Sequence, residues 1–293
     1  MTSTLSERFA AAVAGYERSR FSRLLHSPVR LLHSKVLELY AKQFRKPVWR
    51  RATTFWGDEL NVAFPEGVSM ALYRYQFLER ALTQIMLSTI KPGMVFFDIG
   101  AHFGYYSLLA SHLTGPEGRV HSFEPTPSTY EVLCKNTAAK PNITPRNMAM
   151  WSEPRTLEFR DYGVAYAGFN SVETGGVEDN MREGVRGTPR KVQATTVDAY
   201  VRETGVRPDI LKLDAEGAEL NIIAGMTETI ERSRPILTVE VGNEPAKNVS
   251  RSRELIEAVM AKGYKAFDAR QGDVVPHQLL RKYEYDNILL MPA

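Results

Sequence analysis

Two acidic residues, each at the end of a strand-like run, have the types and spacing to bind a ligand. Asp98 ends the apolar run "MVFFD" and is followed by Gly100 and Gly104, while Glu124 ends the next strand-like run, 24 residues after Gly100. A carboxylate can accept hydrogen bonds from both hydroxyls of a ribose diol. Glycine lets a backbone turn sharply, and amide N–H groups at a helix start suit a carboxylate. We therefore predict a ligand whose ammonium faces Asp98, whose carboxylate meets these amides and whose ribose meets Glu124.

The spacing of the glycines separates two classes of nucleotide ligand. Dinucleotide sites use G-x-G-x-x-G, in which the middle glycine admits a pyrophosphate. Here the segment is Gly100-Ala-His-Phe-Gly104, without a middle glycine. An amino acid joined to a ribose describes S-adenosyl-L-methionine, which is therefore the predicted cofactor. The alternative is a plain Rossmann-like turn in which Asp98 only caps a helix.

A second acidic group, in "LKLDAEGAE" and "TVEVGNE", has the residue types for proton transfer. Methylation of a hydroxyl requires a base that takes the hydroxyl proton. Asp214 is predicted as that base, with Lys212 on the same strand face and with Glu216 and Glu240 as further catalytic carboxylates. Three carboxylates at one edge could also hold a divalent metal ion. The structural alternative is a buried Lys212–Asp214 ion pair, with Glu216 as favourable charge in the first turn of a helix.

Alternating strand-like and helix-like segments must position these residues. The strand-like runs are "MVFFDI", "GRVHSFE", "ITPRNMAM", "DILKLD", "PILTVEV", "YKAFDAR" and "DNILLMP", and helical patterns cover 105–113, 128–139, 217–231 and 251–262. The alternation predicts an α/β fold with a mostly parallel sheet, and it places the acids at the carboxyl edge where ligands bind. No helix separates the last two runs, so the last strand is predicted to be antiparallel.

The region between the third and fourth main strands breaks this alternation. "RTLEFRDYG" and the glycine-rich stretch 163–190 predict a long irregular insertion. Long loops in compact domains are often lids or binding loops. Asn170 and Ser171, a polar pair in "YAGFNSVETGG", are therefore predicted to contact the acceptor substrate.

Residues 1–90 are predicted to form a basic helical extension with a hairpin, ahead of a cofactor-binding domain over 91–293. The chain carries a net charge of +3, yet residues 1–51 hold 11 Lys/Arg against 3 Asp/Glu. Basic and apolar residues alternate at helical spacing across 18–51. This pattern fits peripheral contact with an anionic membrane, or a solvated helix with a basic outer face.

The composition indicates a globular protein of a reducing compartment. Hydrophobic residues make up 43% of the chain, and the single cysteine excludes an internal disulfide framework or a cysteine-built zinc site. No apolar run is long enough to span a bilayer, and no signal-peptide pattern is seen. The predicted location is cytoplasmic, with membrane contact through residues 18–51 left open. The oligomeric state is not predicted.

Six segments, taken in order, resemble the FkbM family of S-adenosylmethionine-dependent methyltransferases. They are "DIGAHFGYYSLLAS", "FEPTPSTYEVLCKN", "NMAM", "TTVDAY", "DILKLDAEGAELNIIAGM" and "RPILTVEVG", whereas "LYRYQFLER" departs from the family's usual sequence. The resemblance implies a Rossmann-like class I methyltransferase fold of seven strands, the last antiparallel. The predicted cofactor-binding residues are Asp98, Gly100, Ala101, His102, Phe103, Gly104, Glu124, Pro125, Asn147 and Ala149.

The resemblance also implies O-methylation of a hydroxyl on a sugar, glycolipid or secondary metabolite. The alternatives are a methyltransferase acting on nitrogen or nucleic acid, a dinucleotide-dependent oxidoreductase, and a binding protein without activity. "LDAEG" stands where base-modifying enzymes carry an Asn/Asp-Pro-Pro-aromatic motif, and residues 52–293 hold 26 basic against 31 acidic residues. We therefore expect a small-molecule or glycan acceptor and no nucleic-acid partner.

Overall fold

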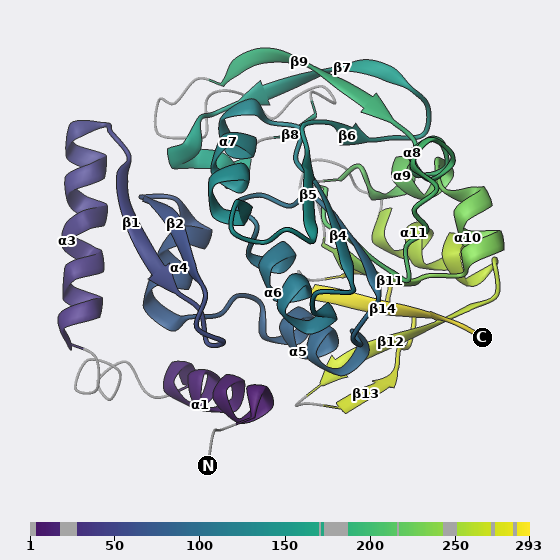
Figure 1. Ribbon diagram of the computed structural model, residues 1–293, viewed down its shortest axis with the longest axis horizontal. Helices are drawn as coiled ribbons and strands as arrows, with labels where there is room; N and C mark the ends of the chain where they lie inside the picture. Colours follow the sequence, from purple (N-terminus) through teal and green to yellow (C-terminus); the bar gives the residue numbers. More distant parts are fainter. Residues whose placement is uncertain are drawn as a thin grey trace.

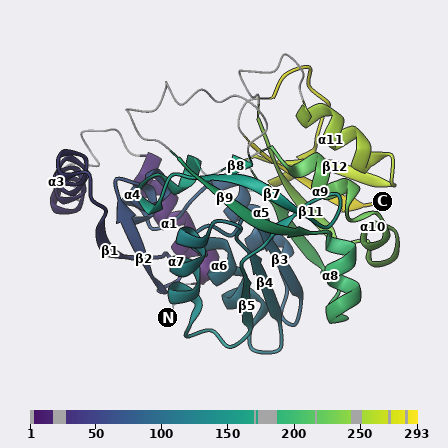
Figure 2. The ribbon, with the colours of Figure 1, turned by 90° about the horizontal axis from the view of Figure 1, so that it is seen from above.

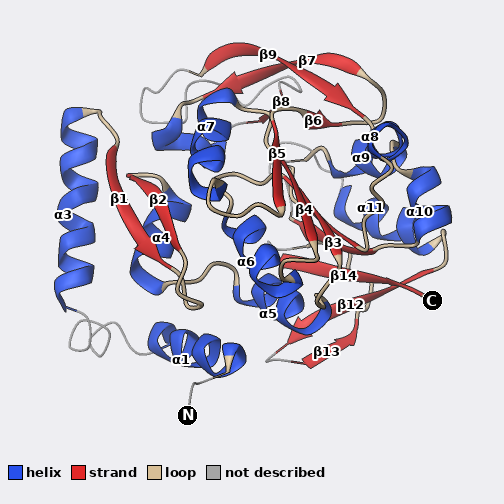
Figure 3. Cartoon of the chain, viewed as in Figure 1, coloured by secondary structure: helices blue, strands red, loops and turns tan. Residues whose placement is uncertain are grey.

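A twisted sheet with helices on both sides forms the centre of the molecule (Figures 1 and 3). The computed structural model describes residues 4–17, 28–169, 171–172, 187–215, 217–242, 251–270, 273–283 and 286–293. The described helices are α1 (Leu5–Glu17), α3 (Pro28–Phe44), α4 (Gly67–Tyr75), α5 (Arg80–Thr89), α6 (Tyr105–Thr114), α7 (Pro127–Thr137), α8 (Val197–Thr204), α9 (Glu219–Ala224), α10 (Thr227–Ser233) and α11 (Arg251–Met260), with the short η1 at Val164–Phe169. The central sheet contains β3 (Val95–Ile99), β4 (Arg119–Phe123), β5 (Ile143–Arg146), β10 (Ile210–Leu213), β11 (Ile236–Val241), β12 (Tyr264–Arg270), β13 (Asp273–Pro276) and β14 (Asp286–Pro292).

The strand order of the central sheet places a ligand site between β3 and β10. The order is β13-β12-β14-β11-β10-β3-β4-β5, and the five strands from β11 to β5 are parallel. The chain leaves β3 toward β4, whereas it leaves β10 toward β11 on the opposite side. The loops after β3 and β10 therefore run in opposite directions from the carboxyl edge of the sheet. Open α/β sheets bind their ligands at such a switch point.

The prediction of an antiparallel last strand is confirmed. β14 lies between β11 and β12 and is antiparallel to both, and the short β13 adds an edge strand to the seven that were expected. Helices α6 and α7 cover one face of the parallel strands and α8 to α11 the other (Figure 2). Side chains alternate between these faces, so Phe96 packs with the α6 cluster and Phe97 with the opposite cluster. Apolar strands buried on both faces explain the continuous apolar runs.

Part of the predicted irregular insertion folds into a second, smaller sheet. Its strands are β6 (Ala149–Met150), β7 (Arg155–Asp161), β8 (Ser171–Val172) and β9 (Thr188–Thr195), in the order β6-β9-β7-β8. The prediction was wrong for β7 and β9, because Leu157 and Phe159 alternate with exposed residues as in a half-buried strand. The run "ITPRNMAM" also divides at Asn147, since β5 joins the central sheet and β6 joins the second sheet.

Residues before β3 form a layer against the α6 side of the sheet. The hairpin of β1 (Val48–Thr53) and β2 (Glu59–Phe64) turns at Gly57-Asp58, as predicted. Phe9, Leu60 and Leu82 belong to the same hydrophobic cluster as Phe96. A domain division near residue 90 stays a prediction, since the two parts share this cluster.

Two helices begin or break differently from the sequence pattern. The segment "YQFLERALTQIMLSTI", which starts at Tyr75, has helical periodicity, but α5 begins only at Arg80 because Gln76 and Glu79 take positive φ angles of 69° and 32°. The predicted helix over 217–231 is divided into α9 and α10 at Gly225. A Cβ at Gly225 would lie 2.1 Å from the carbonyl oxygen of Trp151, so glycine allows the second sheet to approach this break.

Candidate active site

The loop after β3 needs glycine in order to pack against neighbouring parts of the protein. Gly100 has a φ of +79°, and a Cβ there would lie 1.7 Å from the carbonyl oxygen of Asp214. Gly104 has a φ of +90°, and a Cβ there would lie 2.8 Å from Cδ1 of Leu133 in α7. The first glycine therefore brings the β3 and β10 loops together, and the second seats α6 against α7.

Several main-chain amides of this loop donate hydrogen bonds to other parts of the protein. The amides of Gly100 and Ala101 both donate to the carbonyl oxygen of Phe123, at 3.1 and 3.0 Å, and the His102 amide donates to Glu124 at 3.0 Å. These three amides tie the loop to the end of β4, and contact of Gly100, Ala101 and His102 with the cofactor stays a prediction. The first-turn amides of α6 have no acceptor within the helix ladder, so we assign the ligand carboxylate to them in the proposal below.

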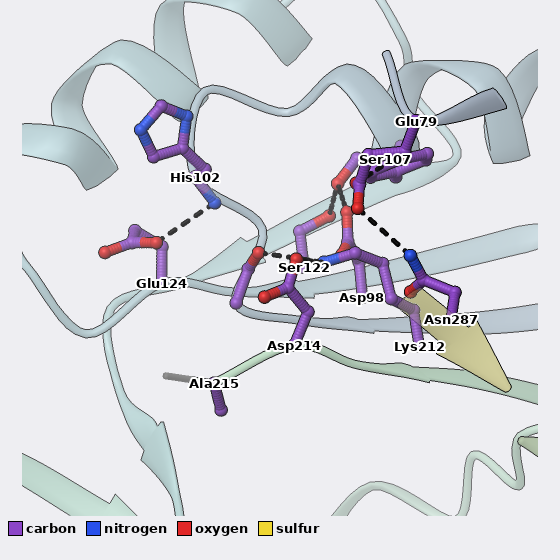
Figure 4. A network of polar contacts seen from close by, with 12 residues as sticks. Glu79, Asp98, His102, Ser107, Ser122, Glu124, Lys212, Asp214, Ala215 and Asn287 are labelled. Atoms are coloured by element: carbon purple, nitrogen blue, oxygen red, sulfur yellow. Dashed lines mark hydrogen bonds and ion pairs between the residues drawn. The ribbon is translucent and has the colours of Figure 1, made fainter. Parts of the chain in front are cut away.

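Glu124 lies on the wall of a cavity at the end of β4. Its Oε2 accepts from His102 and its Oε1 accepts from the amide of Thr126 at 2.9 Å. Asn147 donates at 2.9 Å to the carbonyl oxygens of both Glu124 and Pro125, which fixes the turn behind the carboxylate. Burial raises the pKa of Glu124 to about 7, although its amide donors act in the opposite direction. Figure 4 shows this carboxylate directed toward the glycine loop.

Lys212 lies beneath the switch point, with a side chain only 2% exposed. Its Nζ is 3.1 Å from Oδ2 of Asp214, 3.1 Å from the carbonyl oxygen of Gly100 and 3.3 Å from Oδ1 of Asp98, the last being an ionic contact without hydrogen-bond geometry. Burial alone would lower the pKa of Lys212, but Asp214 and Asp98 outweigh it and hold the pKa well above its usual value. The buried Lys212–Asp214 ion pair, which the sequence analysis gave as the structural alternative to a catalytic role, is thus present.

Asp98 and Asp214 differ in their access to the cavity. Asp98 is fully buried, and its Oδ2 accepts from Ser107 of α6 at 2.6 Å, with Ser122 2.7 Å from Ser107. Its carboxylate therefore faces α6, beneath the cavity, and its predicted contact with a ligand ammonium has no support here. Asp214, in contrast, is 24% exposed and lines the cavity. Asp98 acts on the cavity only through Lys212.

A polar group that the sequence did not indicate lies on the other side of Lys212. Tyr106 donates to Oε2 of Glu79 at 2.6 Å. Asn287 of β14 donates to Oε1 of Glu79 at 3.0 Å (Figure 4). The Lys212 ammonium lies 5.2 Å from the centre of the Tyr106 ring. Burial, together with the charge of Glu79, raises the pKa of Tyr106 well above its ordinary value. Glu79 follows the unassigned segment "LYRYQFL", and 208 residues separate it from Asn287, so no local pattern could reveal the group.

The structure describes some, but not all, of the other predicted catalytic and substrate residues. Glu240, near the end of β11, pairs in register with Asn287 and lines the cavity. Glu216 and Asn170 lie outside the described residues, and Ser171 is described only as part of β8. Among the described residues, no three His, Cys, Asp or Glu side chains form a group that could hold a metal ion.

One cavity of about 840 Å³ connects these groups, within the usual size range of small-molecule sites. It is lined by the segment from Gly100 to Phe103, by Glu124 and Pro125, and by Met148, Ala149 and Met150. Asp214, Glu240 and side chains from α1, α4 and the segment before α5 also line it. The N-terminal layer thus completes the cavity wall.

The strand order and a cavity at the β3/β10 switch point define a Rossmann-like class I methyltransferase fold. Residues 98–266, more than half of the chain, match the methyltransferase FkbM domain, and the chain belongs to this family. Hexuronic acid methyltransferase AglP of Haloferax volcanii is 24% identical over 170 residues, which cover 57% of this chain and 64% of that protein. The 31-O-demethyl-FK506 methyltransferase FkbM of Streptomyces tacrolimicus is 26% identical over 184 residues, covering 55% and 70%.

Among solved structures, a methyltransferase FkbM from Methylobacillus flagellatus is similar with a TM-score of 0.47 and 15% identity. The match covers 76% of this chain and 54% of the other. This chain therefore spans about half of that structure and just under two thirds of AglP.

Proposed function

We propose that this protein transfers a methyl group from S-adenosyl-L-methionine to a hydroxyl group of a sugar, glycolipid or secondary metabolite. The observation that carries the proposal is that Glu124, Asp214 and Glu240 line one and the same cavity. One relative is named a hexuronic acid methyltransferase and the other a 31-O-demethyl-FK506 methyltransferase. These names support a sugar or a metabolite as the substrate, and the second supports oxygen as the acceptor atom.

The cavity residues around Glu124 suit S-adenosyl-L-methionine. Glu124 has the carboxylate that a ribose diol requires, and its neighbours Pro125 and Ala149 give the cavity an apolar wall for a base. The start of α6 offers amides to a carboxylate tail. Asn147 holds the turn of Glu124 in place. The amide of His102 donates to Glu124 and so orients its carboxylate, while the ring of His102 stacks on Phe103 with centroids 4.2 Å apart.

Asp214 is the side chain best placed to take a proton from the acceptor. When bound, the cofactor supplies a methyl group activated by its sulfonium, so that a C–O bond replaces the C–S bond while the hydroxyl proton passes to a base. Lys212 fixes the Asp214 carboxylate at 3.1 Å and balances its charge, and Glu240 offers a second carboxylate on the same wall. Apolar side chains of α4, among them Ala71 and Leu72, line the cavity and would face the acceptor and exclude water.

Two measurements test this function in order. Calorimetric titration should give binding of S-adenosyl-L-methionine and none of NAD. Transfer of labelled methyl should then occur to members of a panel of uronic acids, neutral glycans, glycolipids and polyketide alcohols. Binding of NAD alone would support the oxidoreductase alternative. Transfer to amine analogues or to RNA, and not to hydroxyls, would contradict the acceptor class.

The raised pKa of Glu124 predicts that cofactor binding depends on pH. A diol needs the carboxylate form, whereas the raised pKa of about 7 means that Glu124 binds a proton below that pH. The affinity for S-adenosyl-L-methionine should therefore fall as the pH drops through about 7, by up to about tenfold per pH unit. Calorimetry across this range measures the slope.

A matched pair of variants assigns that slope to one residue. Glu124→Gln cannot titrate and should bind weakly with little dependence on pH. Glu219→Gln removes another buried carboxylate of the cavity wall, whose pKa burial also raises, and should keep the slope. An unchanged slope in Glu124→Gln would show that Glu124 does not meet the ribose as a carboxylate.

A further inference from the structure

A large apolar surface lies on the side of α3 that is directed away from the rest of the protein. In Figures 1 and 2, α3 stands at one edge of the molecule, apart from the central sheet. The outer face of α3, as we name it, consists of side chains that are 54–78% exposed: Val29, Leu32, Val36, Leu39, Tyr40 and Phe44. At about 100° per residue, these positions fall within an arc of about 140°. His33 and Gln43 fall within the same arc, so the surface is mainly, not wholly, apolar. A mainly apolar exposed surface of this kind marks an interaction site.

The opposite side of α3 is held firmly on the protein. Arg74 of α4 donates to the hydroxyl of buried Ser34 at 2.7 Å and lies 3.4 Å from Glu38. Lys35 and Lys42 also pair with Glu38, at 3.2 and 3.3 Å. Lys35 and Lys42 belong to α3 itself, so the two contacts with Arg74 of α4 are the ones that fix the rotation of α3 about its axis and keep the outer face directed away from the protein.

The chain around this face is strongly basic. Residues 1–51 hold 11 Lys/Arg and 3 Asp/Glu, and Arg30, Arg45, Lys46 and Arg50 are exposed. A second copy of the protein would bring an equal positive charge to the contact, whereas anionic lipid would bring the opposite charge. The arc of about 140° is also wider than the narrow seam of two paired helices. Charge and shape together favour a lipid surface over self-association.

We propose that the outer face of α3 docks on an anionic membrane surface, with its apolar side chains at the acyl boundary and the basic residues among the phosphates. Within the described part of the chain, no helix is long and apolar enough to cross a membrane. α4 links the surface to the cavity, since Arg74 bonds to α3 while Val68 and Ala71 line the cavity. Docking therefore holds the cavity one helix layer from the lipid. This inference does not depend on the proposed function.

Sedimentation of the full chain with vesicles tests the proposal. The vesicles contain phosphatidylcholine alone, or equal parts of phosphatidylcholine and phosphatidylglycerol. The protein should bind the anionic vesicles more strongly, and added salt should weaken this binding. Leu32→Ser combined with Leu39→Ser should lower the vesicle affinity about tenfold or more without changing thermal melting, because both side chains are exposed. Arg45→Glu combined with Lys46→Glu should remove the preference for anionic vesicles.

A matched control removes two exposed apolar side chains elsewhere. Met260→Ser with Leu280→Ser should bind vesicles like the parent protein. The proposal fails if the parent does not bind vesicles, or if the α3 and control variants lose affinity equally. A dimer that Leu32→Ser with Leu39→Ser dissociates, without vesicle binding, would assign the outer face to a second copy of the chain.

Discussion

Replacing Gly100 with alanine is expected to abolish binding of S-adenosyl-L-methionine and to destabilise the fold. The new Cβ would lie 1.7 Å from the carbonyl oxygen of Asp214, and the φ of +79° is itself unfavourable for alanine. Backbone atoms cannot rotate away as a side-chain end can, so the loops after β3 and β10 must separate. We expect a loss of about 2–5 kcal/mol of unfolding free energy and at least about a hundredfold in cofactor affinity.

A second glycine distinguishes the steric effect from the conformational one. Gly205 ends α8 with a φ of +69°, but a Cβ there would have no heavy atom within 4 Å. Gly205→Ala should therefore cost only about 1–2 kcal/mol and leave cofactor binding unchanged. Thermal melting and calorimetry of both variants measure the difference. Equal melting temperatures and equal affinities would show that the contact between the two loops does not matter.

The sheet could be predicted from sequence because its strands are buried on both faces. The run around Asp98 is almost uniformly apolar, and the runs before Glu124 and Asp214 are almost wholly buried although they contain His121, Ser122 and Lys212. Strands β7 and β9 were missed because only alternate residues are buried, with charged residues between them. Glycine-rich sequence beside them also suggested an irregular loop.

It was easier to predict from the sequence which residues form the site than to predict which way their side chains point. The pairing of Lys212 with Asp214 follows from their spacing in a strand, and the structure contains it. That Asp98 faces α6 depends on Ser107 of another element, and no residue near Asp98 in sequence shows it. Glu79 could not be found at all, because its partners come from α6 and from β14 at the end of the chain.

Replacing Asp214 with asparagine is expected to lower kcat by about a hundredfold to ten-thousandfold, the usual contribution of a general base. Asparagine keeps the shape of the side chain but cannot take the hydroxyl proton. Lys212 retains Asp98 and the carbonyl oxygen of Gly100 as partners, so the loop should keep its position and cofactor affinity should change little. Turnover on the acceptor found by the panel, and calorimetry with S-adenosyl-L-methionine, measure the two effects separately.

Asp209 provides the matched control at the opposite end of the same strand. Its carboxylate accepts from the amide of Val95 at 2.7 Å, far from the carboxyl edge, so Asp209→Asn should keep both turnover and cofactor affinity. If Asp214→Asn keeps full turnover, the base must be another group on the cavity wall, and Glu240 is the next to test. If it instead loses cofactor binding and melts at a lower temperature, Asp214 serves mainly in the buried ion pair. Only loss of turnover with cofactor affinity retained fits a carboxylate that accepts the proton of the acceptor.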